Sequence, residues 1–107
     1  MLLKVALSLA AFAIVVVAQP EPNVLIGFTN AHDPSICKAG DTWYAFTTAP
    51  GISILTSPDR KNWQLAGVMW PGGANWTDAY TGQRNANLWA PECYYTGSKF
   101  LVSVFES

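Results

Sequence analysis

The stretch Thr42-Trp43-Tyr44-Ala45-Phe46-Thr47-Thr48 decides the fold class. Aromatic and β-branched residues fill almost all of it, which is typical of a β-strand. Turn-forming residues flank it on both sides, with Ala39-Gly40-Asp41 before it and Ala49-Pro50-Gly51 after it. The stretch therefore predicts a short strand at whose two ends the chain reverses direction.

The segments on either side continue the same pattern. Residues 36–38 predict a strand before the first turn, and residues 52–56 predict another after the second. Residues 57–62 form a further turn, and residues 63–68 a fourth strand. Four short strands joined by tight turns predict an antiparallel meander, which is the shape of one propeller blade.

The opening pattern then recurs after a long loop at residues 69–87, a class of segment that is often functional. Pro91 follows Pro34 by 57 residues, and Gly97 follows Gly40 by the same 57. In both copies a proline precedes a short strand, a glycine turn and an aromatic-rich strand. A repeated β-meander of this period predicts an all-β propeller. The second copy holds only two strands, and a propeller needs about four blades to close, so we expect a truncated chain.

The amino terminus predicts a secretory signal peptide at residues 1–18. One basic residue, Lys4, precedes an apolar run at 5–17 that is too short to span a bilayer, and small residues close the run at Ala18. We expect cleavage there, an extracellular location, and a stiff, extended leader at 19–29. A buried amino-terminal helix is the alternative.

Charge restricts the classes of partner. The 107 residues carry a formal net charge of −1, and removal of Lys4 with the signal peptide changes it to −2. The absence of a basic patch argues against a nucleic-acid partner and, after signal cleavage, against a membrane partner. The mature part has the size of one small domain, and we expect the complete protein to be a monomer.

The two cysteines, Cys37 and Cys93, enter an oxidising compartment in which a bridge can persist. In the 57-residue repeat Cys93 aligns with Ile36, the residue before Cys37. The two thiols therefore point to opposite faces of equivalent strands, which makes them face each other across the interface between stacked blades. Stacked sheets lie about 10 Å apart, whereas a bridge needs Cα atoms within about 7 Å. We expect two buried free thiols, with a Cys37–Cys93 disulfide near the propeller axis as the alternative.

Asp33 stands immediately before Pro34, at the entrance of the first strand. Proline pushes the preceding residue out of the helical region, so we expect Asp33 to be extended. A carboxylate there, free to point into a cleft, suits a general base. The alternative is a turn in which Asp33 only bonds its own backbone.

Five segments carry a resemblance to a known family. They are His32-Asp33-Pro34-Ser35, Gly40-Asp41-Thr42-Trp43-Tyr44, Gly51-Ile52-Ser53-Ile54, Ser57-Pro58-Asp59 with Asn62-Trp63, and Asn87-Leu88-Trp89-Ala90-Pro91. In this order and spacing they resemble the start of glycoside hydrolase family 43, and within it fungal arabinanases and arabinosidases. The resemblance covers residues 30–107 and implies a five-bladed β-propeller. Blade one would be residues 33–68, followed by the loop 69–87 and part of blade two at 88–107.

The resemblance implies hydrolysis of arabinan or related arabinose-containing polysaccharides with inversion, like an endo-1,5-α-L-arabinosidase, without a cofactor. The family uses an Asp general base, an Asp that tunes pKa, and a Glu general acid. The base role falls on Asp33, and the other two belong to later blades. Glu92 does not fill the gap, because the family usually has an Asp there that is not its acid. Inversion needs both carboxyls, about 6.5–9.5 Å apart, so we expect the 107-residue chain alone to be inactive.

Other side chains are candidates for binding. Trp89 and Trp70 suit stacking on a sugar or packing in the core, and Asn87 suits a bond to a sugar hydroxyl or a turn cap. We expect His32 to pack beside Asp33, because no second metal ligand has suitable spacing; no metal site is expected. Asn75-Trp76-Thr77 is a glycosylation sequon at Asn75. Five aromatic side chains on strands are expected in the core: Trp43, Tyr44, Phe46, Trp63 and Phe100.

Three alternatives stay open. The same propeller is compatible with β-xylosidase or galactan-cleaving specificity, because the loop at 69–87 shapes the cleft without identifying the sugar. A non-catalytic carbohydrate-binding propeller is the second. A sialidase-like propeller is the third, but residues 57–63 lack the Gly and Thr of its Ser-x-Asp-x-Gly-x-Thr-Trp box.

Overall fold

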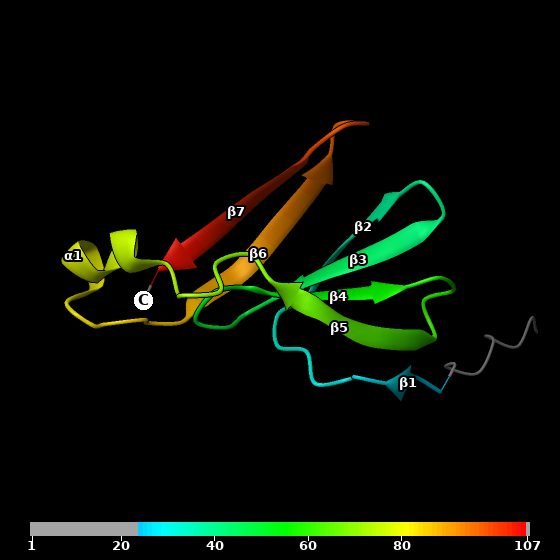
Figure 1. Ribbon diagram of the computed structural model, residues 1–107, viewed down its shortest axis with the longest axis horizontal. Coiled ribbons are helices and arrows are strands. Elements are labelled where there is room, and N and C mark those ends of the chain that lie inside the picture. The colour runs from blue at the N-terminus through cyan, green and yellow to red at the C-terminus, as the bar shows by residue number, and fades with distance from the viewer. Residues whose placement is uncertain (1–23, 107) are drawn as a thin grey trace, which may run out of the picture.

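The computed structural model describes residues 24–106. The expected signal peptide at 1–18 and the first part of the leader lie outside the described residues. Strands make up nearly half of the described chain, in one five-stranded sheet and one two-stranded sheet (Figure 1). Within residues 24–106, no helix has the length and apolar character needed to cross a bilayer.

The larger sheet contains the predicted meander. Its antiparallel strands are β2 (Ser35–Ala39), β3 (Thr42–Thr47), β4 (Ser53–Ser57) and β5 (Asn62–Val68), in spatial order. Their boundaries differ from the predicted ones by one residue at most, so the four-strand prediction is confirmed. One strand was not predicted: β1 (Ile26–Gly27), in the leader, pairs in parallel with β5.

The turn between β4 and β5 is built on the carboxylate of Asp59. Its Oδ1 accepts hydrogen bonds from the backbone amides of Lys61 and Asn62, both at 2.8 Å, and its Oδ2 accepts one from Asn62 Nδ2 at 2.7 Å. These bonds favour the ionised form, and the backbone amide of Asn62 is the largest cause holding the pKa of Asp59 well below its usual value. The turn is therefore tied to an ionised carboxylate.

We predict that this turn loosens in acid. Because the folded-state pKa of Asp59 is depressed, its stabilisation is present above about pH 4, the ordinary pKa of an aspartate, and disappears as the pH falls toward the folded-state value. The stability difference between wild type and Asp59→Asn, from urea unfolding, should shrink over that interval. Asp41→Asn, in the β2–β3 turn, is the matched control. A difference that stayed constant down to pH 2 would contradict the prediction.

The long connection at residues 69–87 contains a 3-10 turn, η1 (Asn75–Thr77), and a short helix, α1 (Asp78–Thr81). Within the predicted loop, these seven residues therefore form short helical elements that were not predicted. Thr77 is fully buried and its hydroxyl donates to the Ala74 carbonyl oxygen at 2.8 Å, while Gly82 ends the helix with a φ of 66°. Elements this short have too few turns to produce a helical pattern in the sequence.

The smaller sheet is a hairpin of β6 (Leu88–Tyr95) and β7 (Phe100–Glu106). Its pairing repeats that of β2 and β3, because Cys37 pairs with Tyr44 and Tyr94 pairs with Leu101. Each partner in the second pair lies 57 residues after its counterpart (94 − 37 and 101 − 44). The repeat read from the sequence is therefore present in the strand register.

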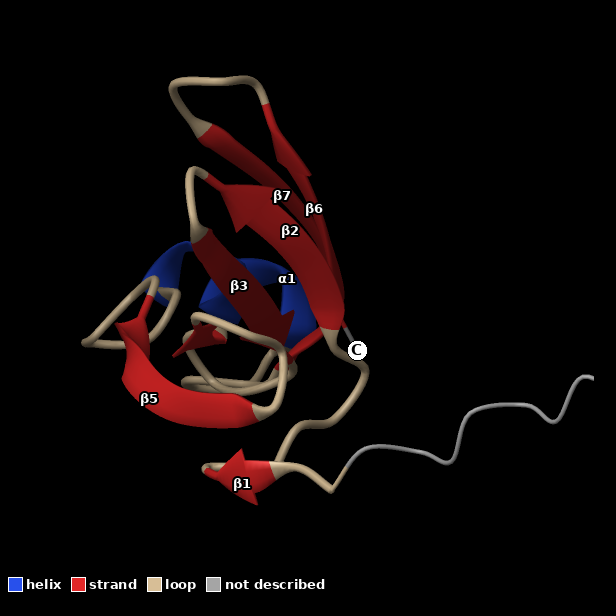
Figure 2. Cartoon of the chain, turned by 90° about the vertical axis from the view of Figure 1, so that its right-hand side faces the viewer, coloured by secondary structure: helices blue, strands red, loops and turns tan. Residues whose placement is uncertain are grey.

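The two sheets pack face to face, with β2 alongside β6 (Figure 2). Their shared core contains Phe46, Ile52, Ala74 and Leu88, all buried. The ring of Phe100, on β7, lies 4.8 Å from that of Tyr44 and 5.4 Å from that of Phe46. A second cluster on the other face of the larger sheet contains Ala45, Leu55 and Trp63, with Trp43 packed against it. All five aromatics expected in the core contact one of these clusters.

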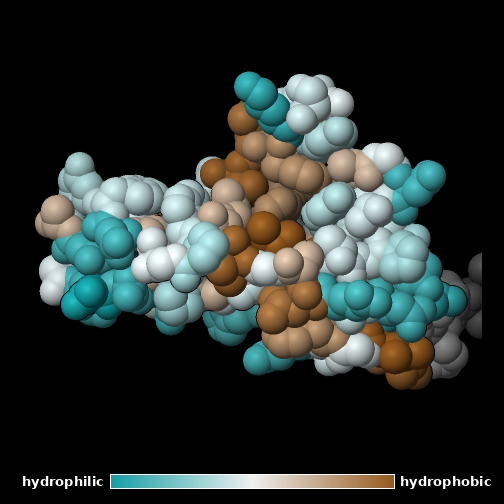
Figure 3. Space-filling view, in the orientation of Figure 1, coloured by the Kyte–Doolittle hydropathy of each residue, from teal (hydrophilic) through white to brown (hydrophobic). Residues whose placement is uncertain are grey.

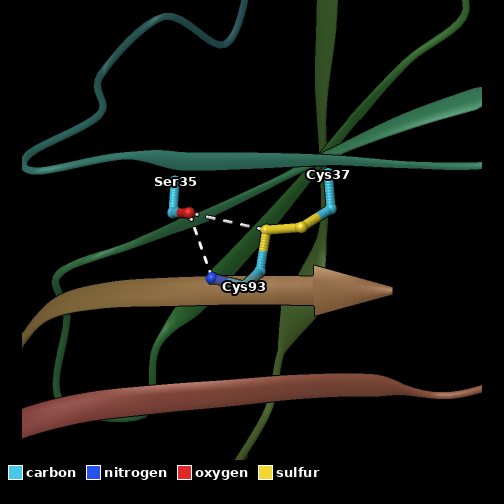
Figure 4. Close-up of a disulfide and its surroundings, with 3 residues drawn as sticks. All are labelled: Ser35, Cys37 and Cys93. Atoms are coloured by element: carbon cyan, nitrogen blue, oxygen red, sulfur yellow. Dashed lines mark hydrogen bonds between the residues drawn. A yellow bond between two sulfur atoms is a disulfide. The ribbon is translucent and has the colours of Figure 1, made fainter. Parts of the chain in front are cut away.

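A disulfide between Cys37 on β2 and Cys93 on β6 connects the sheets (Figure 4). The expectation of two free thiols is therefore wrong. It assumed the ordinary spacing between sheets, whereas the two Cα atoms are 6.1 Å apart. Ser35 helps to explain the close approach, since its hydroxyl accepts a hydrogen bond from the Cys93 amide at 3.1 Å and lies 3.5 Å from the Cys93 sulfur.

We predict that the denatured, unreduced protein has no reactive thiol, because both cysteines of the chain are bridged. Replacing both cysteines by serine should lower the free energy of unfolding by about 2–4 kcal/mol, since the bridge restricts the unfolded chain. Urea denaturation of the variant and the wild type measures this difference. Two reactive thiols per chain before reduction would rule the bridge out.

Apolar side chains remain exposed on the hairpin. Leu101 is 58% exposed and Phe105 is 70% exposed, both on β7. A pocket of about 560 Å³ lies between this strand and the end of the larger sheet, lined in part by Met69 and Phe100. Figure 3 shows hydrophobic side chains gathered over the middle of the molecule, seen in the orientation of Figure 1. Among the described residues, no strand pairs with the outer edge of β7.

Candidate active site

Asp33 lies in the segment between β1 and β2, and its backbone is not extended. Its φ is 46°, in the left-handed region, so the expectation of an extended residue is wrong. Asp tolerates that region better than most residues, because its short polar side chain can bond locally. The Thr48 amide donates a hydrogen bond to the His32 carbonyl oxygen at 3.0 Å, which holds this segment against the end of β3.

The carboxylate of Asp33 has two contacts, and both use the same oxygen. His32 Nδ1 lies 3.0 Å from Oδ2, and the Thr48 hydroxyl donates to Oδ2 at 3.5 Å. The Asp33 side chain is 48% exposed, so water reaches it. Neither contact involves the backbone of Asp33 itself, unlike the turn alternative. Oδ1 has no bond to the described residues, so it is free to accept a hydrogen bond from a water molecule.

A pocket of about 370 Å³ opens beside this carboxylate. Its lining consists of His32, Asp33, Thr48, Asn87 and Trp89. The structure thus brings Asp33 together with two of the three side chains proposed for sugar binding. Asn87 is exposed, and Trp89 is 48% exposed, so an indole face is available to a ligand.

Leu88 explains why Asn87 and Trp89 reach this pocket. Its side chain is fully buried, and its amide donates a hydrogen bond to the Ala49 carbonyl oxygen at 3.1 Å. Successive side chains along a strand point to opposite faces. With Leu88 anchored in the core, its two neighbours are turned outward, toward the end of β3 and Asp33.

The third proposed binding residue, Trp70, does not line this pocket. It is half-buried, packs against the shared core, and contacts Trp76 edge to face at a centroid distance of 6.0 Å. Glu92 lines the other pocket, next to β7, and is likewise not beside Asp33. Asn75 is exposed at the start of η1, so glycosylation there stays a prediction.

Thr48 is a pocket residue that the sequence did not reveal. It follows β3 directly, and in the sequence it is one more β-branched residue of that strand. Its hydroxyl accepts a hydrogen bond from the Ala90 amide at 3.0 Å, across 42 residues. Only the packing of the second hairpin against the first sheet creates this contact, so no local pattern could have signalled it.

The pocket holds one carboxylate, that of Asp33, among its lining residues. A single carboxylate can take a proton from water or orient a hydroxyl group. It cannot at the same time protonate a leaving group on the opposite side of a sugar, which inverting hydrolysis requires of a second carboxyl about 6.5–9.5 Å away. The described lining therefore has one of the two carboxyls that such a site needs.

Comparisons with known proteins agree on one family. The family model for glycosyl hydrolases family 43 matches residues 23–105. An extracellular exo-α-(1→5)-L-arabinofuranosidase of Cellvibrio japonicus is 38% identical over 73 residues, which are 68% of this chain and 21% of that protein. An extracellular endo-α-(1→5)-L-arabinanase of Bacillus subtilis is 32% identical over 101 residues, which are 89% of this chain and 31% of that protein.

A solved structure points the same way. The family 43 endo-arabinanase from Bacillus licheniformis superposes with a TM-score of 0.67 at 31% identity, over 77% of this chain and 29% of that one. The chain thus spans less than a third of the length of these relatives. The matched residues include Asp33, Thr48, Asn87 and Trp89 within the family model. The chain belongs to glycosyl hydrolase family 43.

Proposed function

We propose that this chain forms part of a secreted glycosidase that hydrolyses arabinan, or a related arabinose-containing polysaccharide, with inversion. The observation that carries the proposal is the half-exposed Asp33 carboxylate beside Trp89 and Asn87 in one pocket, in a chain of family 43. The relatives named as an arabinofuranosidase and an arabinanase support this substrate. Two of them are named extracellular, which supports secretion.

Asp33 acts as the general base in this proposal. With Oδ2 engaged by His32 and Thr48, Oδ1 takes the proton from a water molecule that attacks the anomeric carbon. Trp89 offers its indole face to a sugar ring, and Asn87 bonds to sugar hydroxyls. The proton for the leaving oxygen comes from a carboxylic acid on the other side of the sugar, which residues outside the described chain supply.

We further propose that the two sheets belong to a five-bladed β-propeller. Residues 33–68 form blade one, residues 69–87 the connecting loop, and residues 88–107 the start of blade two. The repeated register of the two hairpins supports this arrangement. The exposed apolar side chains of β7 support it as well, because a following blade would cover them.

The first test is replacement of the base. Asp33→Asn keeps the size of the side chain but cannot accept the proton, so kcat on debranched arabinan should fall by about a hundred- to ten-thousand-fold. The assay uses the longer protein that results when the reading frame is extended past the Ser107 codon into the following genomic DNA. Asp41→Asn in the same protein is the control. Near-normal turnover by Asp33→Asn would refute the base assignment. Turnover of xylan or galactan in place of arabinan would indicate the alternative specificities.

The second test uses the 107-residue chain alone. We predict no hydrolysis of arabinan, because Asp33 is the one carboxylate among the described residues that line its pocket. Reducing-sugar release is compared with a matched blank, and binding of an arabino-oligosaccharide is measured in parallel by calorimetry. Turnover above the blank would show that the chain contains the acid after all.

A further inference from the structure

Thr48 joins three segments around the pocket. Its amide donates to the His32 carbonyl oxygen at 3.0 Å, its hydroxyl donates to Asp33 Oδ2 at 3.5 Å, and the same hydroxyl accepts from the Ala90 amide at 3.0 Å. These partners come from the Asp33 segment and from β6. One residue at the end of β3 therefore links the carboxylate to the strand that carries Trp89.

The bond from Ala90 determines what the hydroxyl can do. A threonine hydroxyl has one proton to donate and two lone pairs that accept. The Ala90 amide occupies a lone pair, so the proton is available to Asp33 Oδ2. A separation of 3.5 Å is long for such a bond, but bonds at catalytic sites commonly tighten when substrate binds.

The backbone on both sides of this link is unusual. Asp33 has a φ of 46° and Ala90 a φ of 43°, a region that non-glycine residues rarely adopt. Such conformations persist only where surrounding contacts hold them, and they concentrate at functional sites. Thr48 bonds directly to both residues, through the carboxylate of Asp33 and the amide of Ala90.

We propose that Thr48 is a positioning residue for the reaction. Its hydroxyl holds the Asp33 carboxylate by Oδ2, so that Oδ1 faces the attacking water, and it fixes that carboxylate relative to the backbone beside Trp89. The inference rests on the proposed function, because it gives Thr48 a role through the general base. A catalytic group must be held close to its productive geometry, since small displacements are costly in rate.

The test compares two substitutions at one position. Thr48→Val replaces the hydroxyl by a methyl group of similar size, whereas Thr48→Ser keeps the hydroxyl. Both variants are made in the longer protein used for the arabinan assay. There we expect kcat to fall about ten- to a hundredfold in Thr48→Val, since the lost hydrogen bond is to the charged Asp33 carboxylate. KM should change less than kcat, and Thr48→Ser should restore most of the rate. Thr56→Val, the same change on β4, should behave as wild type.

A second measurement needs no turnover. Three-bond couplings about the Cα–Cβ bond of Asp33, measured by NMR in the chain itself, should report one dominant rotamer in wild type and Thr48→Ser. In Thr48→Val they should average over several rotamers. Averaged couplings in the wild type would overturn the inference even if Thr48→Val does not fold.

The outcomes separate this inference from the proposed function. If Asp33→Asn is inactive while Thr48→Val keeps both its rate and a single Asp33 rotamer, only the role of Thr48 is overturned. If Asp33→Asn is fully active, the base assignment fails, and the positioning role fails with it.

Discussion

The site depends on one constraint, the hydrogen bond from the Leu88 amide to the Ala49 carbonyl oxygen. The Leu88 side chain beside this bond is fully buried in the core. It sets the register of β6 against the end of β3. Full burial of one leucine contributes about 2 kcal/mol, more than the roughly 1 kcal/mol net of a neutral hydrogen bond. Burial of Leu88 therefore contributes more to docking of the hairpin at this point than the hydrogen bond does. The polar contacts of Thr48 and Ser35 reinforce this register, and the disulfide at Cys93 keeps β6 close to β2.

Much of the fold was predictable because its signals are local. Each strand of the meander has its own composition and its own turn residues, and the 57-residue repeat foretold how the second hairpin pairs. The grouping of Asp33 with Asn87 and Trp89 was not derivable from spacing, and it rested on a family resemblance. In the structure, the packing around Leu88 brings these three residues together.

The errors arose where contacts between distant segments override local preferences. The disulfide was discounted on the ordinary spacing of sheets, yet Cys37 and Cys93 sit where the strands approach closely. The proline after Asp33 suggested an extended backbone at that residue. The hydrogen bond from the Thr48 amide to the His32 carbonyl oxygen instead holds Asp33 in the left-handed region. Thr48 was counted as a strand residue because its partner, Ala90, lies 42 residues away.

The central claim is that Asp33 activates water for an inverting hydrolysis, and the configuration of the first product tests it most directly. Proton NMR of arabinan during the earliest turnovers distinguishes the two anomers of the newly formed reducing end before they equilibrate. The account predicts the anomer opposite to that of the bond cleaved, because water attacks from the side of Asp33. First release of the anomer with retained configuration would mean a covalent intermediate, and would contradict a base role for this carboxylate.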